Sequence, residues 1–229
     1  MTELHEPSSQ AFSPVRFWLI TVTVIAAVVG LSLFSGKLLD QALPANPLPV
    51  LATIKGDLEA TERSGAKVRL SELRGKVVVA AYLYTLCPHG CAAVTAQMQK
   101  LNQEFSSNPE LHLLSVAIQP ERDNTALLKA YAEAVGATEK SAWWFITGER
   151  QKLWDYMTKE VGMTQAIPIP EDERITPDDE YEHDLRIALI DQEGRVRAYY
   201  SVFHPQTEIA TLMCERLHQD VHRLLKTSH

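Results

Sequence analysis

The stretch that decides the fold is VVVAAYLYTLCPHGC, which occupies residues 77–91. It opens on an apolar run rich in β-branched and aromatic side chains, a pattern that predicts a buried strand. The run AAVTAQM, residues 92–98, follows and predicts a helix. Cys87 and Cys91 therefore stand where a strand passes into a helix. Pro88 suits the first position of that helix, because proline has no N–H group to leave unpaired there.

Cys87 and Cys91 are four positions apart, so on a helix their sulfur atoms would lie on one face, one turn from each other. A thiolate at a helix N-terminus is stabilised by the free N–H groups and the helix dipole. Such a pair can chelate a soft metal or cycle between dithiol and disulfide. Two thiolates favour Cu(I), with zinc as the common competitor, and they need at least one further ligand. Three intervening residues leave both uses open.

Histidine is the natural further ligand, and the chain contains eight. His183 ends an acidic segment just before an expected strand at 185–190, and a mixed sheet could bring it to the edge that carries the cysteines. His89 lies between the cysteines and is expected to project from the other side of the turn. His218 and His222 are four positions apart on the last expected helix. We interpret this pair as a solvated helix face, because the sequence offers no acidic or cysteine partner that completes a metal-binding set.

The chain divides into four parts by composition. Residues 1–16 are polar without periodicity and are expected to form a disordered tail. Residues 17–34 carry no charge and predict a transmembrane anchor, since eighteen helical residues span about 27 Å. A cleaved signal peptide is the competing interpretation, although its apolar core is usually shorter. Residues 35–50 contain three prolines and are expected to form a stiff tether. Residues 51–229 form the globular domain.

Charge and cysteine content restrict the function. The net charge of −7 argues against a nucleic-acid partner. Three cysteines are too few for a disulfide scaffold, so the close pair is expected to be reactive or metal-binding. Cys214 falls in the helical pattern near the C-terminus, and we expect it to be a buried small apolar side chain. The charges that flank the apolar segment do not determine the orientation of the chain in a membrane.

The order of expected elements describes an α/β sheet that ends in a β-hairpin. The segment 167–184 interrupts this order with three prolines and eight acidic residues, and we expect a mobile polar loop with few buried contacts. The expected strands are a hairpin at 58–70 and single strands at 77–84, 111–118, 143–146, 185–190 and 196–200. Helices are expected at 89–105, 149–161 and 206–226, and a further helix is expected to begin after Asp123 as its N-cap.

Several segments of the chain resemble a known family. The segment from Gly75 to Cys91 is similar to the Sco/SenC family of membrane-tethered copper proteins. The same resemblance extends through PERDNT (120–125), WFITG (144–148), YEHD (181–184) and LIDQEG (189–194). These segments cover most of the globular domain and occur in the family's order. Gln119, Asp184 and the His89-Gly90 pair depart from the residues that many members carry.

The resemblance implies a thioredoxin-like fold with an inserted acidic loop and a terminal β-hairpin, preceded by one N-terminal transmembrane helix. It implies a copper site made by Cys87, Cys91 and His183, for Cu(I) and also Cu(II). It implies a role in building the binuclear copper site of cytochrome c oxidase, with the copper-bearing oxidase subunit and other copper carriers as partners. The domain would then face the periplasm from a bacterial-type inner membrane, or the intermembrane space of a mitochondrion.

Three functions remain open at this stage. The first is a copper chaperone that uses all three ligands. The second is a thiol-disulfide reductase, in which Cys87 attacks and Cys91 resolves the mixed disulfide. His183 discriminates between these two, because a copper site requires it and a reductase has little use for it. A thiol peroxidase or redox sensor is the third, although the sequence shows no Thr-x-x-Cys peroxide pocket.

Overall fold

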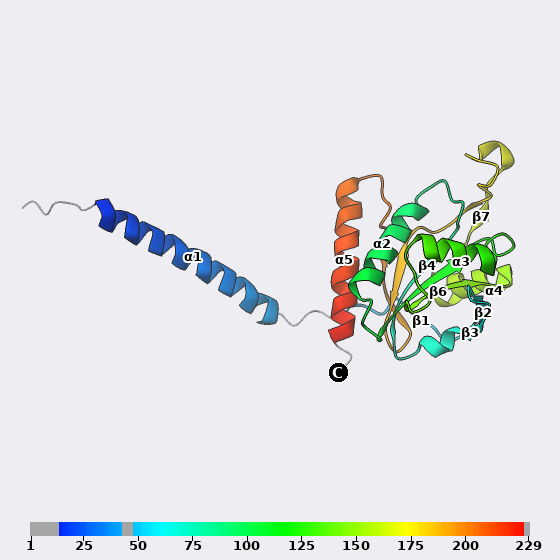
Figure 1. The fold of residues 1–229 in the computed structure, drawn as a ribbon, viewed down its shortest axis with the longest axis horizontal. Helices are drawn as coiled ribbons and strands as arrows, with labels where there is room; N and C mark the ends of the chain where they lie inside the picture. The colour runs from blue at the N-terminus through cyan, green and yellow to red at the C-terminus, as the bar shows by residue number, and fades with distance from the viewer. Residues whose placement is uncertain (1–13, 43–47, 227–229) are drawn as a thin grey trace, which may run out of the picture. The chain divides into compact units, whose positions relative to one another are not determined.

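The computed structural model describes residues 14–42 and 48–226. The chain forms two compact units, which divide after residue 47. The first unit contains one helix, α1 (Pro14–Ala42), drawn in blue in Figure 1. Its stretch Val15–Ser32 has a mean hydropathy of 2.0 and is long and apolar enough to cross a membrane.

Helix α1 is longer than the apolar segment that identified it. Residues 14–16 and 35–42, which the sequence pattern placed in the tail and the tether, are helical. The extension at the C-terminal end is physically reasonable, because Leu, Gln and Ala are good helix formers and the prolines come later. Residues 1–13 and 43–47, which hold the rest of the expected tail and part of the expected tether, lie outside the described residues.

The second unit is built on an eight-stranded mixed sheet with the order β1-β10-β9-β4-β5-β6-β2-β3. Strands β4, β5 and β6 are parallel, whereas the other pairs are antiparallel. The α/β sheet and its terminal hairpin, β9 with β10, are therefore confirmed. The strands are β1 (Ala52–Thr53), β2 (Glu59–Glu62), β3 (Lys67–Arg69), β4 (Val77–Leu83), β5 (Leu111–Ala117), β6 (Trp143–Thr147), β9 (Ile187–Ile190) and β10 (Arg195–Tyr200).

Helices cover both faces of this sheet (Figure 1). Because side chains alternate along a strand, Val77 and Val79 of β4 face one apolar cluster and Val78 and Ala80 face the other. Every residue of β4 is buried, as expected for a central strand covered on both sides. The cluster with Val77 and Val79 includes residues of α2 (Cys91–Glu104), α3 (Thr125–Ala134) and α5 (Thr207–Lys226). The cluster with Val78 and Ala80 includes residues of α4 (Arg150–Asp155), a π-helical turn (Tyr156–Glu160) and a 3-10 turn (Leu70–Leu73).

Asn124, and not Asp123, caps helix α3. The side-chain oxygen of Asn124 accepts hydrogen bonds from the N–H groups of Ala126 and Leu127, each at 3.1 Å. Both residues are good N-caps, so the sequence alone does not choose between them. The choice is made by tertiary structure, because Asp123 is fully buried and its side chain accepts a hydrogen bond from the Thr85 hydroxyl. The expectation that Asp123 caps the helix is therefore wrong.

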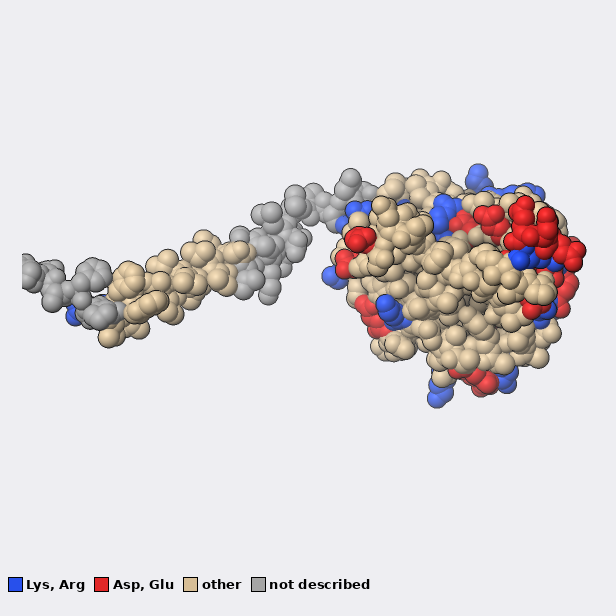
Figure 2. Space-filling view, turned by 90° about the horizontal axis from the view of Figure 1, so that it is seen from above, with Lys and Arg blue, Asp and Glu red and all other residues tan. Residues whose placement is uncertain are grey.

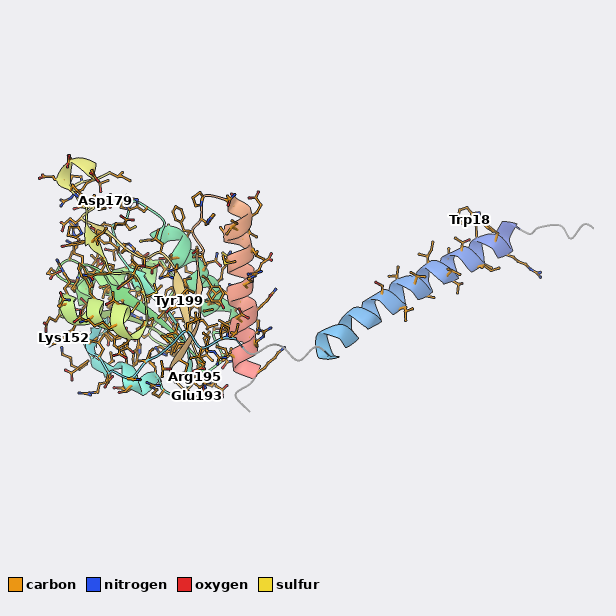
Figure 3. The ribbon with its side chains drawn as sticks, turned by 180° about the vertical axis from the view of Figure 1, so that it is seen from behind. Trp18, Lys152, Asp179, Glu193, Arg195 and Tyr199 are labelled. Atoms are coloured by element: carbon orange, nitrogen blue, oxygen red, sulfur yellow. The ribbon has the colours of Figure 1, made fainter. Side chains whose placement is uncertain are left out.

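The acidic segment 167–184 contains a second, two-stranded sheet of β7 (Ile167–Pro168) and β8 (Tyr181–Glu182), with a 3-10 turn at Glu171–Glu173 between them. Acidic side chains gather at the end of the domain that carries β7 (Figure 2). Asp179, labelled in Figure 3, is fully buried. Asp184 is the other buried residue of the segment, so the expectation of few buried contacts holds apart from these two carboxyl groups.

Polar side chains from the sheet side hold the acidic segment in place. Arg122 donates to Asp178 at 2.5 Å, and the Gln119 amide donates to Glu180 at 2.7 Å. Each of these donors follows strand β5, so the segment lies over the carboxyl ends of the parallel strands. This is the edge of the sheet at which the cysteine pair is also found.

Candidate metal centre

The cysteine pair lies at the carboxyl end of β4. Helix α2 begins at Cys91 with Gly90 as its N-cap, and Cys87 lies in the preceding turn, where its N–H donates to Tyr84 at 3.2 Å. The helix was expected to begin at residue 89 with Pro88 in its first position, and both expectations are wrong, because Pro88 lies before the N-cap. Cys87 itself stays outside the helix, as expected for a residue before proline, which avoids helical dihedral angles.

The turn is closely packed at Gly90. A Cβ atom at this position would lie 2.4 Å from the Phe203 ring and 2.9 Å from a Leu185 methyl group. The absence of a side chain at Gly90 thus lets the chain after β10 and the chain before β9 approach the start of α2. The same packing leaves Cys91 only 4% exposed, whereas Cys87 is half-buried.

His183 joins the two cysteines from a distant part of the chain. His183 lies between β8 and β9 in the sequence. Strand β9 runs antiparallel to β4, so the start of β9 lies beside the end of β4. The Cys91 Sγ atom is 3.2 Å from His183 Nε2. One donor atom from each of Cys87, Cys91 and His183 lies within 4.8 Å of the other two. The structure thus brings together all three residues that the sequence singled out.

Hydrogen bonding orients the His183 ring toward the sulfur atoms. Its Nδ1 atom lies 3.1 Å from the backbone oxygen of Asp184. A carbonyl oxygen can only accept, so Nδ1 carries a proton, and in the neutral ring Nε2 keeps its lone pair. The rings of Tyr82 and Tyr84 each meet the imidazole edge-on, with centroids 6.2 Å apart. Nε2 is therefore positioned as a metal ligand before any metal binds.

The two sulfur atoms differ in acidity. A hydrogen bond from Cys91 holds the pKa of Cys87 at about 4, against the opposing effect of burial, and contacts with the His183 ring and with the N–H groups of Cys91 and His89 contribute. The hydrogen bond to Cys87 and the burial of Cys91 raise the pKa of the Cys91 thiol above its usual value. The pair therefore holds one thiolate and one thiol near neutral pH. Metal binding through both sulfur atoms would release the remaining proton.

Asp123 is a residue of this region that the sequence analysis did not assign to the site. It follows β5, the strand next to β4, and its negative charge contributes to the raised pKa of Cys91. Burial raises the pKa of Asp123 itself to about 6. Its position after a parallel strand, like that of Cys87, is the sequence signal that could have placed it here.

The remaining candidate residues lie away from the three donor atoms. His89 Nε2 is 2.9 Å from Asp179 Oδ1, so His89 contacts the acidic segment, as expected for a residue on the other side of the turn. Cys214 is half-buried and packs against the apolar cluster under α5. His218 and His222 lie on α5, and both contact Glu104 of α2. The expectation that no acidic partner completes this pair is wrong, because Glu104 is far away in sequence but adjacent in the fold.

A cavity of about 360 Å³ opens beside His183. Its lining includes His89, Leu185 and Phe203 together with the residues of β7. A larger cavity of about 680 Å³ lies between β2 and α4, and Lys152, labelled in Figure 3, lines it. The described lining of this larger cavity contains neither cysteine nor histidine, so of the two cavities only the smaller includes a candidate ligand, His183.

Comparison with known proteins identifies the family of the chain. The family model described as SCO1/SenC matches residues 48–218, which is more than half of the chain. The chain belongs to the SCO1/SenC family. A curated relative, the SCO1 protein homolog of Bacillus subtilis, is 26% identical over 141 residues, which are 61% of this chain and 69% of the relative.

Solved structures of Sco proteins share the fold. A SCO1/SenC family lipoprotein from Bacillus anthracis superposes with a TM-score of 0.63 at 24% identity, covering 78% of this chain and 98% of its own. ScoI from Bradyrhizobium japonicum, solved with copper bound, gives a TM-score of 0.55 at 20% identity over 71% and 98% of the two chains. The thioredoxin-like fold that the resemblance implied is thereby confirmed.

Proposed function

We propose that this protein is a membrane-anchored copper chaperone that takes part in the assembly of cytochrome c oxidase. Cys87, Cys91 and His183 would hold the copper as cargo. The observation that carries the proposal is the placement of two sulfur atoms and one oriented imidazole nitrogen within 4.8 Å of one another. Membership of the SCO1/SenC family supports it, and so does the copper bound to ScoI of Bradyrhizobium japonicum.

The ligand set suits the cargo. Two thiolates are soft ligands that select Cu(I), and an added imidazole is also a good ligand for Cu(II). Cys87 is half-buried, and His183 lines a cavity together with Phe203 and Leu185. Incoming cysteine or histidine ligands of a partner could therefore reach the metal by ligand exchange. The partners would be the copper-bearing subunit of the oxidase and other copper carriers.

The anchor defines where this exchange would take place. The stretch Val15–Ser32 of α1 is long enough to span a membrane once. We propose that the copper-binding unit faces the periplasm from a bacterial-type inner membrane. The intermembrane space of a mitochondrion is the corresponding alternative. In either case the tether would keep the copper site near a membrane-embedded oxidase.

A thiol-disulfide reductase is the second candidate, and the unequal acidity of the cysteines favours it. The Cys87 thiolate would attack a disulfide of the partner, forming a mixed disulfide and releasing one partner sulfur as a thiolate. Cys91 would then lose its proton and attack Cys87, which releases the second partner sulfur. The partner gains two electrons, and the chain is left with a Cys87–Cys91 disulfide that an external dithiol must reduce.

Competition for Cu(I) against a chelator tests the proposal. We expect the reduced protein to bind Cu(I), whereas the oxidised protein and Cys87→Ser should lose binding, because each lacks the soft sulfur pair. His183→Ala should weaken binding by less, since both thiolates remain. Cys214→Ser is the matched control and should bind as the wild type does.

Two outcomes would overturn the chaperone proposal. Equal Cu(I) affinity in the oxidised and reduced forms would place the metal elsewhere. Failure of every form to bind Cu(I), combined with reduction of disulfides by the reduced protein, would establish the reductase instead. A His183→Ala variant that reduces disulfides at the wild-type rate but no longer supports oxidase assembly would support copper delivery.

A further inference from the structure

Two histidines and a carboxylate meet where the end of α2 lies beside α5. His218 Nδ1 is 2.5 Å from Glu104 Oε2, and His222 Nε2 is 2.7 Å from Glu104 Oε1. The two helices lie side by side in Figure 1, and these contacts join them. One carboxylate thus stands between two imidazoles that are one helical turn apart.

The three side chains are held in place yet open to solvent. Their exposed fractions are 22% for His218, 51% for His222 and 36% for Glu104. The ring of Phe105 packs against the ring of His222, with centroids 4.7 Å apart. Phe105 is itself buried, so it fixes the orientation of that imidazole from the protein side. An ion could reach the group from solvent without any movement of the helices.

We propose that Glu104, His218 and His222 form a second metal site, selective for a divalent cation of intermediate hardness, Cu²⁺ before Zn²⁺. Histidines at i and i+4 on a helix present two nitrogens to one ion. Imidazole and carboxylate ligands suit Zn²⁺ and Cu²⁺, and Cu²⁺ binds more tightly to such sites in the general order of divalent metals. Water would complete the coordination. Each imidazole nitrogen now contacts a different oxygen of Glu104, so the three side chains would have to turn for their donor atoms to meet at one ion.

This site would be independent of the cysteine site. Cys91 begins α2 and Glu104 ends it, so the length of the helix, about 20 Å, separates the two. The sites share no ligand, and they differ in chemistry because only the first contains thiolates. Cys214 lies one turn before His218, but it packs against the apolar cluster under α5, so we leave it outside the ligand set.

Alternatively, the three side chains bind no metal and only connect α5 to α2, an arrangement that we call a clamp. The hydrogen bonds from His218 and His222 lower the pKa of Glu104, although its partial burial acts in the opposite direction. Such contacts could serve only to join α5 to α2. The two accounts differ in one measurable respect, because a clamp changes the stability of the metal-free protein but gives these residues no role in metal affinity.

The test uses the full-length chain in detergent, without an affinity tag, carrying Cys87→Ser and Cys91→Ser so that the first site cannot bind copper. Cu²⁺ and Zn²⁺ are titrated separately against chelators. We expect one ion to bind in this region, with imidazole nitrogen couplings in the Cu²⁺ electron paramagnetic resonance spectrum. His218→Gln and His222→Gln should each lower Cu²⁺ affinity about tenfold or more, and Glu104→Gln less. His204→Gln is the matched control and should change nothing.

Protection against chemical modification gives a second readout without substitution in the site. Zn²⁺ should slow the modification of His218 and His222 by diethyl pyrocarbonate and leave that of His204 unchanged. Cu²⁺ affinity and couplings that persist in both histidine variants would overturn the proposal. So would a loss of thermal stability in those variants with unaltered metal affinity, or equal modification of all three histidines with and without Zn²⁺.

Discussion

At the scale of single residues, the buried carboxyl group of Asp123 makes stability depend on pH. Its Oδ1 accepts a 2.5 Å hydrogen bond from Thr85, and its Oδ2 has no hydrogen-bond partner among the described residues. Burial raises its pKa from 3.8 to about 6. The folded state therefore keeps a proton that the unfolded state releases. Its contribution to stability is complete below pH 3.8 and is lost as the pH rises through about 6.

Replacing Asp123 by Asn should remove this pH dependence. We expect Asp123→Asn to raise the free energy of unfolding by roughly 1–3 kcal/mol at about pH 8, because the wild type must bury a charge there. The difference should nearly vanish below about pH 4. Urea unfolding at both pH values measures it. Asp172→Asn, at an exposed position, is the control. Destabilisation by Asp123→Asn at the higher pH would contradict the argument.

The sequence could identify the three proposed ligands but not what orients them. The spacing of Cys87 and Cys91 is a local signal, and His183 precedes a recognisable strand. The Asp184 backbone oxygen that holds the His183 ring carries no signal, since every residue offers a carbonyl group. Glu104 was missed for a related reason, because its contacts with α5 depend on how two helices pack and not on local sequence.

At the scale of elements, the β7–β8 sheet is the part of the domain whose behaviour should respond to metal. Strand β8 ends at Glu182, directly before His183, and Asp179 ties the preceding turn to His89. We expect Cu(I) bound through His183 to slow hydrogen exchange in residues 181–184. Hydrogen exchange followed by mass spectrometry, with and without Cu(I), measures this effect.

Two variants separate the contributions to this response. His183→Ala should abolish the effect of Cu(I), whereas Asp179→Ala should speed exchange in residues 171–180 in both states, because the turn loses its buried anchor. Exchange in β9 serves as the internal control. Exchange around His183 that is unchanged by saturating Cu(I) would argue that this histidine is not a ligand.

The central elements were predictable because their signals are strong and local. Strand β4 is an unbroken apolar run, and α5 has an apolar face at helical spacing. The errors occur where tertiary contacts decide between local alternatives. Helix α2 begins at Cys91, two residues later than expected, and Asp123 accepts a hydrogen bond from Thr85 instead of capping α3. The strands β7 and β8 are two residues long, too short for a periodic signal.

At the scale of the whole molecule, the second unit begins at Leu48, three residues before the expected boundary at 51. The guanidinium group of Arg197 donates to the backbone oxygens of Leu48 and Pro49. Arg197 is buried and also pairs with Asp191 at 2.7 Å. These contacts attach the last residues of the expected tether to strand β10, so they belong to the folded unit.

The division after residue 47 predicts how the chain behaves when it is cut. The full-length protein should stay with membranes after an alkaline carbonate wash, because the apolar stretch Val15–Ser32 has no charged side chain except Arg16 near its start. A chain that begins at Leu48 should be released and fold. One that begins at Leu51 should unfold about 1–3 kcal/mol more easily, since the buried Arg197 loses two backbone acceptors. Membrane fractionation, the mass of the recovered chain and urea unfolding test these outcomes.

Release of the full-length chain by high salt alone would exclude a spanning anchor. Recovery of only a shortened chain would identify a cleaved signal peptide.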